Sequence, residues 1–200
     1  MKEEKQFFLK SQFWMSTIQA SFSRANIYTH FLVKNKKEHI ASDSIKNEFK
    51  TKLWELIDVY LIPGYLNSKD VEQYHEECIK HIKDWSKNYA DFLLGGELKI
   101  GVCQKLLNLY LKYLWCADMI DFTPPHFPLD RIIQEQFKTR ITVGSWTKID
   151  DYMEYKEKVL KVSNLLKQDS IAEWELRKYN DLFREQMNKP AKHEHLGKQK

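Results

Sequence analysis

Two residues of this chain, Lys105 and Asp130, are of types that together can carry out covalent catalysis. A lysine amine is a nucleophile that forms Schiff bases with carbonyl carbons, and a nearby carboxylate can stabilise positive charge that develops during the reaction. Asp130 follows a loop with three prolines at positions 124, 125 and 128, and such a stiff loop can hold a functional group in place. Asp130 also directly precedes a short apolar segment, so a second interpretation makes it an ordinary helix N-cap.

Lys105 lies in a stretch that we predict to be a buried, central helix over residues 100–120, because apolar residues occur nearly all round it. Its polar residues fall within an arc of roughly 100° on that helix. The arc contains Gln104, Lys105, Asn108 and Lys112, with Gly101 and Trp115 on the same side. This polar stripe is either the solvent edge of the helix or the lining of a cleft, where a lysine is chemically useful.

A metal site is the first alternative that the sequence raises. His75, Cys78 and His81 are separated by two residues each, which spreads three ligand types over roughly 120° of a helix. The metalloprotease spacing HExxH is absent, because Ile79 stands where the second histidine would be. Cys78 also falls on the apolar face. We therefore predict a buried cysteine between two surface histidines, with no metal and no cofactor.

A second alternative rests on Arg24 and His30, which are six residues apart. Some helical ribonuclease toxins place an arginine and a histidine at this spacing. On one helix such a pair could hold a phosphate and transfer a proton.

The elements that position these residues are predicted to be helical. Apolar residues recur at helical spacing, and capping residues or glycine and proline bound most segments. We predict helices over residues 3–33, 42–62, 67–94, 100–120, 131–137, 147–168 and 170–187. The only strand-like piece, residues 141–146, is too short to build a sheet. The fold class is therefore all-α, with about seven helices around the 100–120 helix.

Domain organisation and composition narrow the class of protein. Residues 1–187 are predicted to form a single domain, or two packed helical subdomains with a boundary near residue 95, followed by a polar tail over residues 188–200. The net charge of +4 permits a nucleic-acid partner. The chain has three cysteines without CxxC spacing, no long apolar run and no signal-peptide pattern, so we expect a cytoplasmic protein outside the membrane.

The stretch Gly101-Val102-Cys103-Gln104-Lys105, followed by Pro128-Leu129-Asp130-Arg131-Ile132, resembles the core of the helix-hairpin-helix DNA glycosylase superfamily. The Gln-Lys pair and the proline-bearing loop are most similar to its archaeal 8-oxoguanine glycosylase branch. The segment Ser170 to Tyr179 is loosely similar to the C-terminal helix of that branch.

The resemblance implies a DNA glycosylase and lyase that acts on double-stranded DNA, in which Lys105 is the nucleophile and Asp130 the catalytic aspartate. Helix-start amides near Gly101 would hold a phosphate. The target base would be flipped out of the duplex. Its binding pocket would draw on Gln104, Asn108, Lys112, Trp115, Phe127, Trp146 and Trp174. Such a protein would associate with the nucleoid. The broad alternative is a non-enzymatic helical binding protein, related to defence or phage, that uses the aromatic face of residues 7–32.

Overall fold

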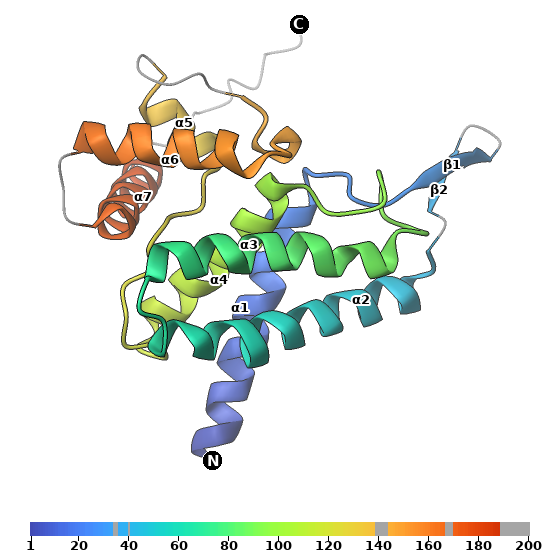
Figure 1. The fold of residues 1–200 in the computed structure, drawn as a ribbon, viewed down its shortest axis with the longest axis horizontal. Helices are drawn as coiled ribbons and strands as arrows, with labels where there is room; N and C mark the ends of the chain where they lie inside the picture. Colours follow the sequence, from blue (N-terminus) through green and yellow to red (C-terminus); the bar gives the residue numbers. More distant parts are fainter. Residues whose placement is uncertain (34–35, 40, 139–143, 167–169, 189–200) are drawn as a thin grey trace, which may run out of the picture.

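The computed structural model describes residues 1–33, 36–39, 41–138, 144–166 and 170–188, and its fold is all-α with one short hairpin (Figure 1). The α-helices are α1 (Lys2–Phe22), α2 (Asp43–Glu55), α3 (Val71–Ser86), α4 (Ile100–Cys116), α5 (Arg131–Gln136), α6 (Tyr152–Leu166) and α7 (Ile171–Met187). Shorter helical segments are η1 (Leu56–Leu61), η2 (Ile62–Leu66), η3 (Lys87–Tyr89) and η4 (Trp146–Lys148). The antiparallel strands β1 (His30–Val33) and β2 (Lys36–His39) form the hairpin.

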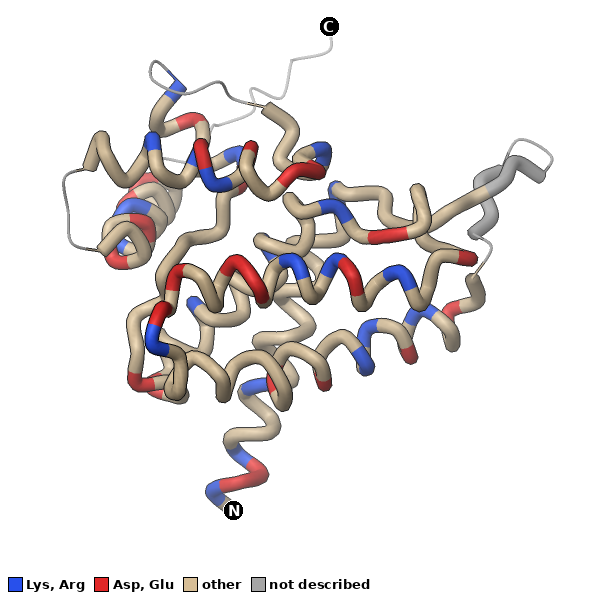
Figure 2. The backbone as a smooth tube through the Cα atoms, in the orientation of Figure 1, with Lys and Arg blue, Asp and Glu red and all other residues tan. Residues whose placement is uncertain are grey.

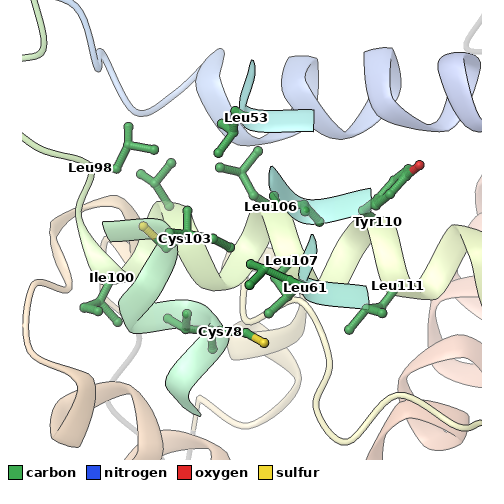
Figure 3. Close-up of a cluster of buried hydrophobic side chains, with 14 of the residues drawn as sticks. Leu53, Leu61, Cys78, Leu98, Ile100, Cys103, Leu106, Leu107, Tyr110 and Leu111 are labelled. Atoms are coloured by element: carbon green, nitrogen blue, oxygen red, sulfur yellow. The ribbon is translucent and has the colours of Figure 1, made fainter. Parts of the chain in front are cut away.

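Helix α4 is the central element, as its apolar sequence predicts. It packs against α1, α3, α6 and η4. Its Leu106, Leu107 and Tyr110 are fully buried in a cluster that also receives side chains from α2 and α3 (Figure 3). The helix ends at Cys116 rather than at residue 120. The chain turns there because Asp118 adopts a left-handed backbone conformation with φ of 53°.

The prediction of helix through residue 33 is wrong, because α1 ends at Phe22. Asn26 has a φ of 47°, which an α-helix cannot contain. The next residues are extended and pair with a distant part of the chain: Leu94 N donates to Ile27 O at 2.7 Å, and Thr29 N donates to Phe92 O at 2.8 Å. Arg24 therefore lies in a turn and His30 in β1, so the two residues do not share a helix.

The second and third predicted helices are found with changed ends. Ser42 caps α2 as predicted, and the helical path continues through η1 and η2, which contains Pro63. Helix α3 begins later than predicted, at Val71, and Asp70 caps it. Helix α3 also stops at Ser86 rather than at residue 94. The connection to α4 passes through Gly95 and Gly96, which have φ of 82° and 81°.

Helices α5, α6 and α7 lie together on one side of the molecule, beyond the end of α3 (Figure 1). Ser170 caps α7, as its capping-box spacing predicts. The inner face of α6 is formed by Tyr152, Tyr155, Val159 and Val162. Met153, Leu160 and Leu165 lie on the outer face of α6 and are exposed.

Two expectations fall outside the described residues: the first half of the strand-like piece (141–143) and nearly all of the polar tail (189–200). None of the helices in the described part of the chain combines the length and the apolar composition needed to cross a bilayer.

Candidate active site

Lys105 of α4 and Asp130 at the start of α5 meet in the folded chain. Lys105 Nζ lies 3.2 Å from Asp130 Oδ2, and it also lies 4.4 Å from the ring centroid of Trp146. The two carboxylate oxygens of Asp130 have separate tasks, since Oδ1 accepts the backbone N–H of Ile133 at 3.2 Å and caps α5. Both interpretations of Asp130, as an N-cap and as the partner of a lysine, therefore hold at the same time.

The glutamine next to Lys105 fixes the segment that carries Asp130. The side-chain amide of Gln104 forms two hydrogen bonds with the backbone of Leu129: Leu129 N donates to Oε1 and Nε2 donates to Leu129 O, each at 3.1 Å. One turn further along α4, Asn108 Nδ2 donates to Phe127 O at 3.1 Å and to Tyr155 Oη at 3.0 Å. Gln104 and Asn108 are fully buried, so the polar stripe of α4 is not a solvent edge.

The segment around Trp146 packs against the start of α4, beside Lys105. Gly101 allows this, because a Cβ at position 101 would overlap the carbonyl oxygen of Trp146. Gly101 N donates to Ile149 O at 2.9 Å. The expectation that this amide holds a phosphate is therefore wrong for the folded chain, since the protein itself occupies it.

A second glutamine attaches the Trp146 segment to α5. Gly144 N donates to Gln134 Oε1 at 3.0 Å, and Gln134 Nε2 donates to Gly144 O at 3.2 Å. Gln134 is fully buried. Two amide side chains thus set the backbone positions of the loop before Asp130 and of the segment before Trp146.

Lys105 and Asp130 line a pocket of about 300 Å³ between α1, α4, α5 and α7. A second buried ion pair lines the same pocket, because Lys112 Nζ lies 2.7 Å and 2.9 Å from the two carboxylate oxygens of Glu175. Burial raises the pKa of Glu175, and the neighbouring Lys112 opposes that shift. Lys112 Nζ also lies 4.4 Å from the ring centroid of Tyr179. The remaining wall comes from Ala20, Ser23, Arg24, Leu109, Tyr113, Pro128, Arg131, Ile132, Ile133 and Trp146.

The nine site residues predicted from sequence fall into three groups. Those that line the pocket are Lys105, Asp130, Lys112 and Trp146. Those that are buried behind it and hold its walls are Gln104, Asn108 and Phe127. Trp115 and Trp174 are half-buried and do not line it; the Trp174 ring packs on Phe137 at 5.0 Å between centroids.

The sequence did not point to Glu175, Tyr179, Leu109 or Arg131 as pocket residues, and it singled out Arg24 only for the ribonuclease alternative. One signal was available. Glu175 stands on the inward face of an amphipathic helix, four residues after Ile171, and a carboxylate in such a position needs a buried partner.

His75 belongs to a second buried cluster, next to Asn108 and the loop before Asp130. Tyr65 Oη and His75 Nδ1 are 2.6 Å apart, and the His75 and His126 ring centroids are 4.6 Å apart. His126 in turn contacts Tyr155 Oη and a carboxylate oxygen of Glu72, each at 2.9 Å. Burial lowers the pKa of His75 well below 6.5, and the charge of a protonated His126 would lower it further.

The prediction that His75 lies on the surface is wrong, whereas His81 is exposed and Cys78 is buried as expected. Burial raises the pKa of the Cys78 thiol to about 11. No group of three His, Cys, Asp or Glu side chains in the described ranges is arranged to hold a metal ion.

Comparison with known proteins returned no matching family model, no matching curated protein and no matching solved structure. The site therefore has to be interpreted from its own geometry.

Proposed function

We propose that this protein is a DNA glycosylase and lyase that acts on a damaged or modified base flipped into the pocket. The observation that carries the proposal is the pairing of Lys105 with Asp130. A primary amine and a carboxylate lie 3.2 Å apart in one pocket, although 25 residues separate them in the chain. The same two residues carry the resemblance to the glycosylase superfamily.

The pair can perform the two halves of such a reaction. Asp130 Oδ2 accepts a proton from the Lys105 ammonium, which leaves a neutral amine. The amine attacks C1′ of the deoxyribose, the glycosidic bond breaks, and the base leaves with the bonding electrons and takes up a proton. The sugar ring then opens to an imine between Lys105 and C1′. The carboxylate also stabilises the positive charge that develops on the sugar.

The remainder of the pocket suits one base. Its volume of about 300 Å³ is at the small end of ligand sites. Leu109 offers an apolar surface and Tyr179 an aromatic one for stacking. The ion pair of Lys112 and Glu175 offers hydrogen-bond donors and acceptors to the edge of the base. The side chains of these individual wall residues would therefore determine which base the pocket accepts.

The test is borohydride trapping on duplexes that contain an abasic site or an oxidised purine. We expect the wild-type protein to form a covalent adduct with the abasic duplex, because borohydride reduces the imine to a stable amine. Lys105→Gln should form none. Lys161→Gln is the matched control, since Lys161 is an exposed lysine of α6 outside the pocket.

Asp130→Asn separates the catalytic task of Asp130 from its structural one. An asparagine oxygen still accepts the N–H of Ile133 and so keeps the cap, but it cannot take the proton of Lys105. We expect trapping to slow by about 100-fold or more while the melting temperature changes little. Adduct formation by Lys105→Gln at the wild-type rate, or no adduct with the wild-type protein on any duplex, would overturn the proposal.

One observation favours a second candidate, a helical binding protein without catalysis. Phe7 and Phe8 near the start of α1 are 62% and 60% exposed, which is unusual for aromatic side chains outside an interface. The ribonuclease alternative gains no such support, because Arg24 lines the pocket and His30 does not. A wild-type protein without any adduct would favour the binding protein.

A further inference from the structure

A second hollow shares three lining residues with the pocket, so the two spaces adjoin. Arg24, Arg131 and Trp146 line both spaces, and Gly144, Ser145 and Thr147 complete the wall of the second. Its volume is about 390 Å³, and it is open to solvent. A polymeric ligand with one of its units in the pocket could therefore place its next unit in the second hollow.

The charges at this junction are nearly all paired. Within the pocket, Lys105 pairs with Asp130 and Lys112 pairs with Glu175, while Arg131 pairs with Glu135 at 2.7 Å. Arg24 is exposed, and no described residue forms an ion pair or a hydrogen bond with its guanidinium. The junction of the two hollows thus carries one uncompensated positive charge among the described residues, which favours an anionic ligand.

The second hollow, which Arg24 lines, also offers hydroxyl groups. Ser145 Oγ and Thr147 Oγ1 are 2.8 Å apart, so one donates to the other and the accepting hydroxyl keeps its own hydrogen for an external acceptor. The two hydrogen bonds between Gln134 and Gly144 hold this wall in place before any ligand binds. An arginine and a preformed hydroxyl pair are groups that bind phosphate oxygens.

Two other parts of the described surface, the start of α4 and helix α3, offer no comparable anion site. The backbone amide of Gly101, at the start of α4, donates to Ile149 O and is not available to a ligand. Along α3, Glu72, Glu76 and Glu77 precede Lys80 and Lys83, and Asp84 follows, so that helix presents no continuous basic track (Figure 2). Arg24 lines both the pocket and the second hollow, so it is placed to contact the backbone of a DNA strand that holds one nucleotide in the pocket.

We propose that the second hollow is a phosphate subsite, in which Arg24 and the Ser145–Thr147 hydroxyls bind the DNA phosphate next to the nucleotide held in the pocket. This inference rests on the proposed function. It assigns Arg24 to substrate binding, and it makes the Trp146 segment the wall that separates the nucleotide from its neighbouring phosphate.

Binding is measured in the Lys105→Gln background, with a duplex that carries a tetrahydrofuran abasic analogue, so that no reaction occurs. Adding Arg24→Gln should weaken the Kd by about tenfold, because one charged hydrogen-bonding contact is lost. The slope of log K against log salt concentration should decrease by about 0.9, the value for one phosphate contact. Arg184→Gln is the matched control, since Arg184 is an exposed arginine of α7 that lines neither hollow.

A methylphosphonate duplex makes the test specific for the phosphate. Each of the two phosphates that flank the analogue is replaced in turn by a neutral methylphosphonate. At one of the two positions, the replacement should make the Kd of the Arg24→Gln protein equal to that of the protein that retains Arg24. Equal Kd values and equal salt slopes for Arg24→Gln and Arg184→Gln, in a protein whose wild type forms the Lys105 adduct, would overturn the subsite alone. If the wild type neither binds the duplex nor forms an adduct, the proposed function fails and the subsite fails with it.

Discussion

The two lysines of the pocket, Lys105 and Lys112, are two turns apart on one face of α4, and each meets a carboxylate from a later part of the chain. The two pairs differ in exposure. The Asp130 side chain is 21% exposed, whereas that of Glu175 is 4% exposed. Water can reach the first pair and support proton transfer there. In the second pair, which water reaches less, the Lys112 ammonium and the Glu175 carboxylate stabilise each other's charge in place of water. The second pair is therefore the more sensitive to the loss of one partner.

We expect Lys112→Met to lower the free energy of unfolding by about 3 kcal/mol or more, because it leaves the Glu175 carboxylate buried without its cation. The double variant Lys112→Met with Glu175→Leu should recover most of the loss, since no buried charge remains. Urea denaturation measures both.

Lys161→Met, at an exposed ion pair of α6, should cost at most about 1 kcal/mol. If Lys112→Met were as stable as the double variant, the buried Glu175 carboxylate would not depend on the charge of Lys112 for its stabilisation.

At the scale of elements, the site depends on three close approaches to α4 and α5. Gln104 holds the backbone of Leu129, Gln134 holds the backbone of Gly144, and Gly101 lets the Trp146 carbonyl pack directly on α4. Each contact brings an irregular segment onto a helix without a regular hydrogen-bond ladder. Each glutamine satisfies two backbone groups, so the loss of either glutamine leaves two backbone groups without these partners.

Two glycines test this arrangement. Gly101→Ala should destabilise the protein by about 3 kcal/mol or displace the 146–149 segment, because the new Cβ would overlap the Trp146 carbonyl. Gly144→Ala should change stability by no more than about 1 kcal/mol, because no atom lies within 4 Å of its Cβ position. Thermal denaturation and the fluorescence of Trp146 report the two effects. Similar melting temperatures for the two variants would argue against the close approach at Gly101.

At the scale of the whole molecule, the buried His75 links folding to pH. Its pKa lies well below 6.5 in the folded protein because burial disfavours the charged ring, whereas an unfolded chain protonates it near 6.5. Below that value the unfolded state binds a proton that the folded state does not. As far as His75 is concerned, the free energy of unfolding therefore has its full value above pH 6.5 and decreases as the pH falls below 6.5.

We expect the free energy of unfolding to decrease from pH 6.5 to pH 5, with His75 contributing up to about 1.4 kcal/mol per pH unit. His75→Gln should flatten this dependence, whatever it does to stability at pH 7. His81→Gln should leave it unchanged, because His81 is exposed on the same helix. Chemical denaturation across this pH range gives the slopes. Equal slopes in the two variants would rule out His75 as their source.

The sequence predicts the helical part of this fold well, because the period of apolar residues and the caps Ser42, Asp130 and Ser170 are local signals. The sequence also singles out Lys105 and Asp130 as candidate site residues. A lysine on a buried helix and an aspartate after a stiff loop can each be recognised without knowing the fold. Sequence reasoning did not predict the end of α1 at Phe22, which depends on pairing with residues 92–94 far along the chain. Nor did it predict the partners of Gln104, Gln134 and Lys112, because burial of a polar side chain is decided by tertiary packing.

The two glutamines have a consequence for how the site can change by mutation. Both bind the main chain of their target segments, and Gln104 Oε1 also accepts from the Asn108 side chain at 3.2 Å. The side chain of Leu129 and those of the residues that follow Gly144 are therefore not part of these contacts. Substitutions at Ser145 or Thr147 can alter the surface of the second hollow while Asp130 stays 3.2 Å from Lys105. The Lys105–Asp130 pair and the surface of the second hollow can thus change independently by mutation, so a new surface can arise in the hollow without loss of the pair.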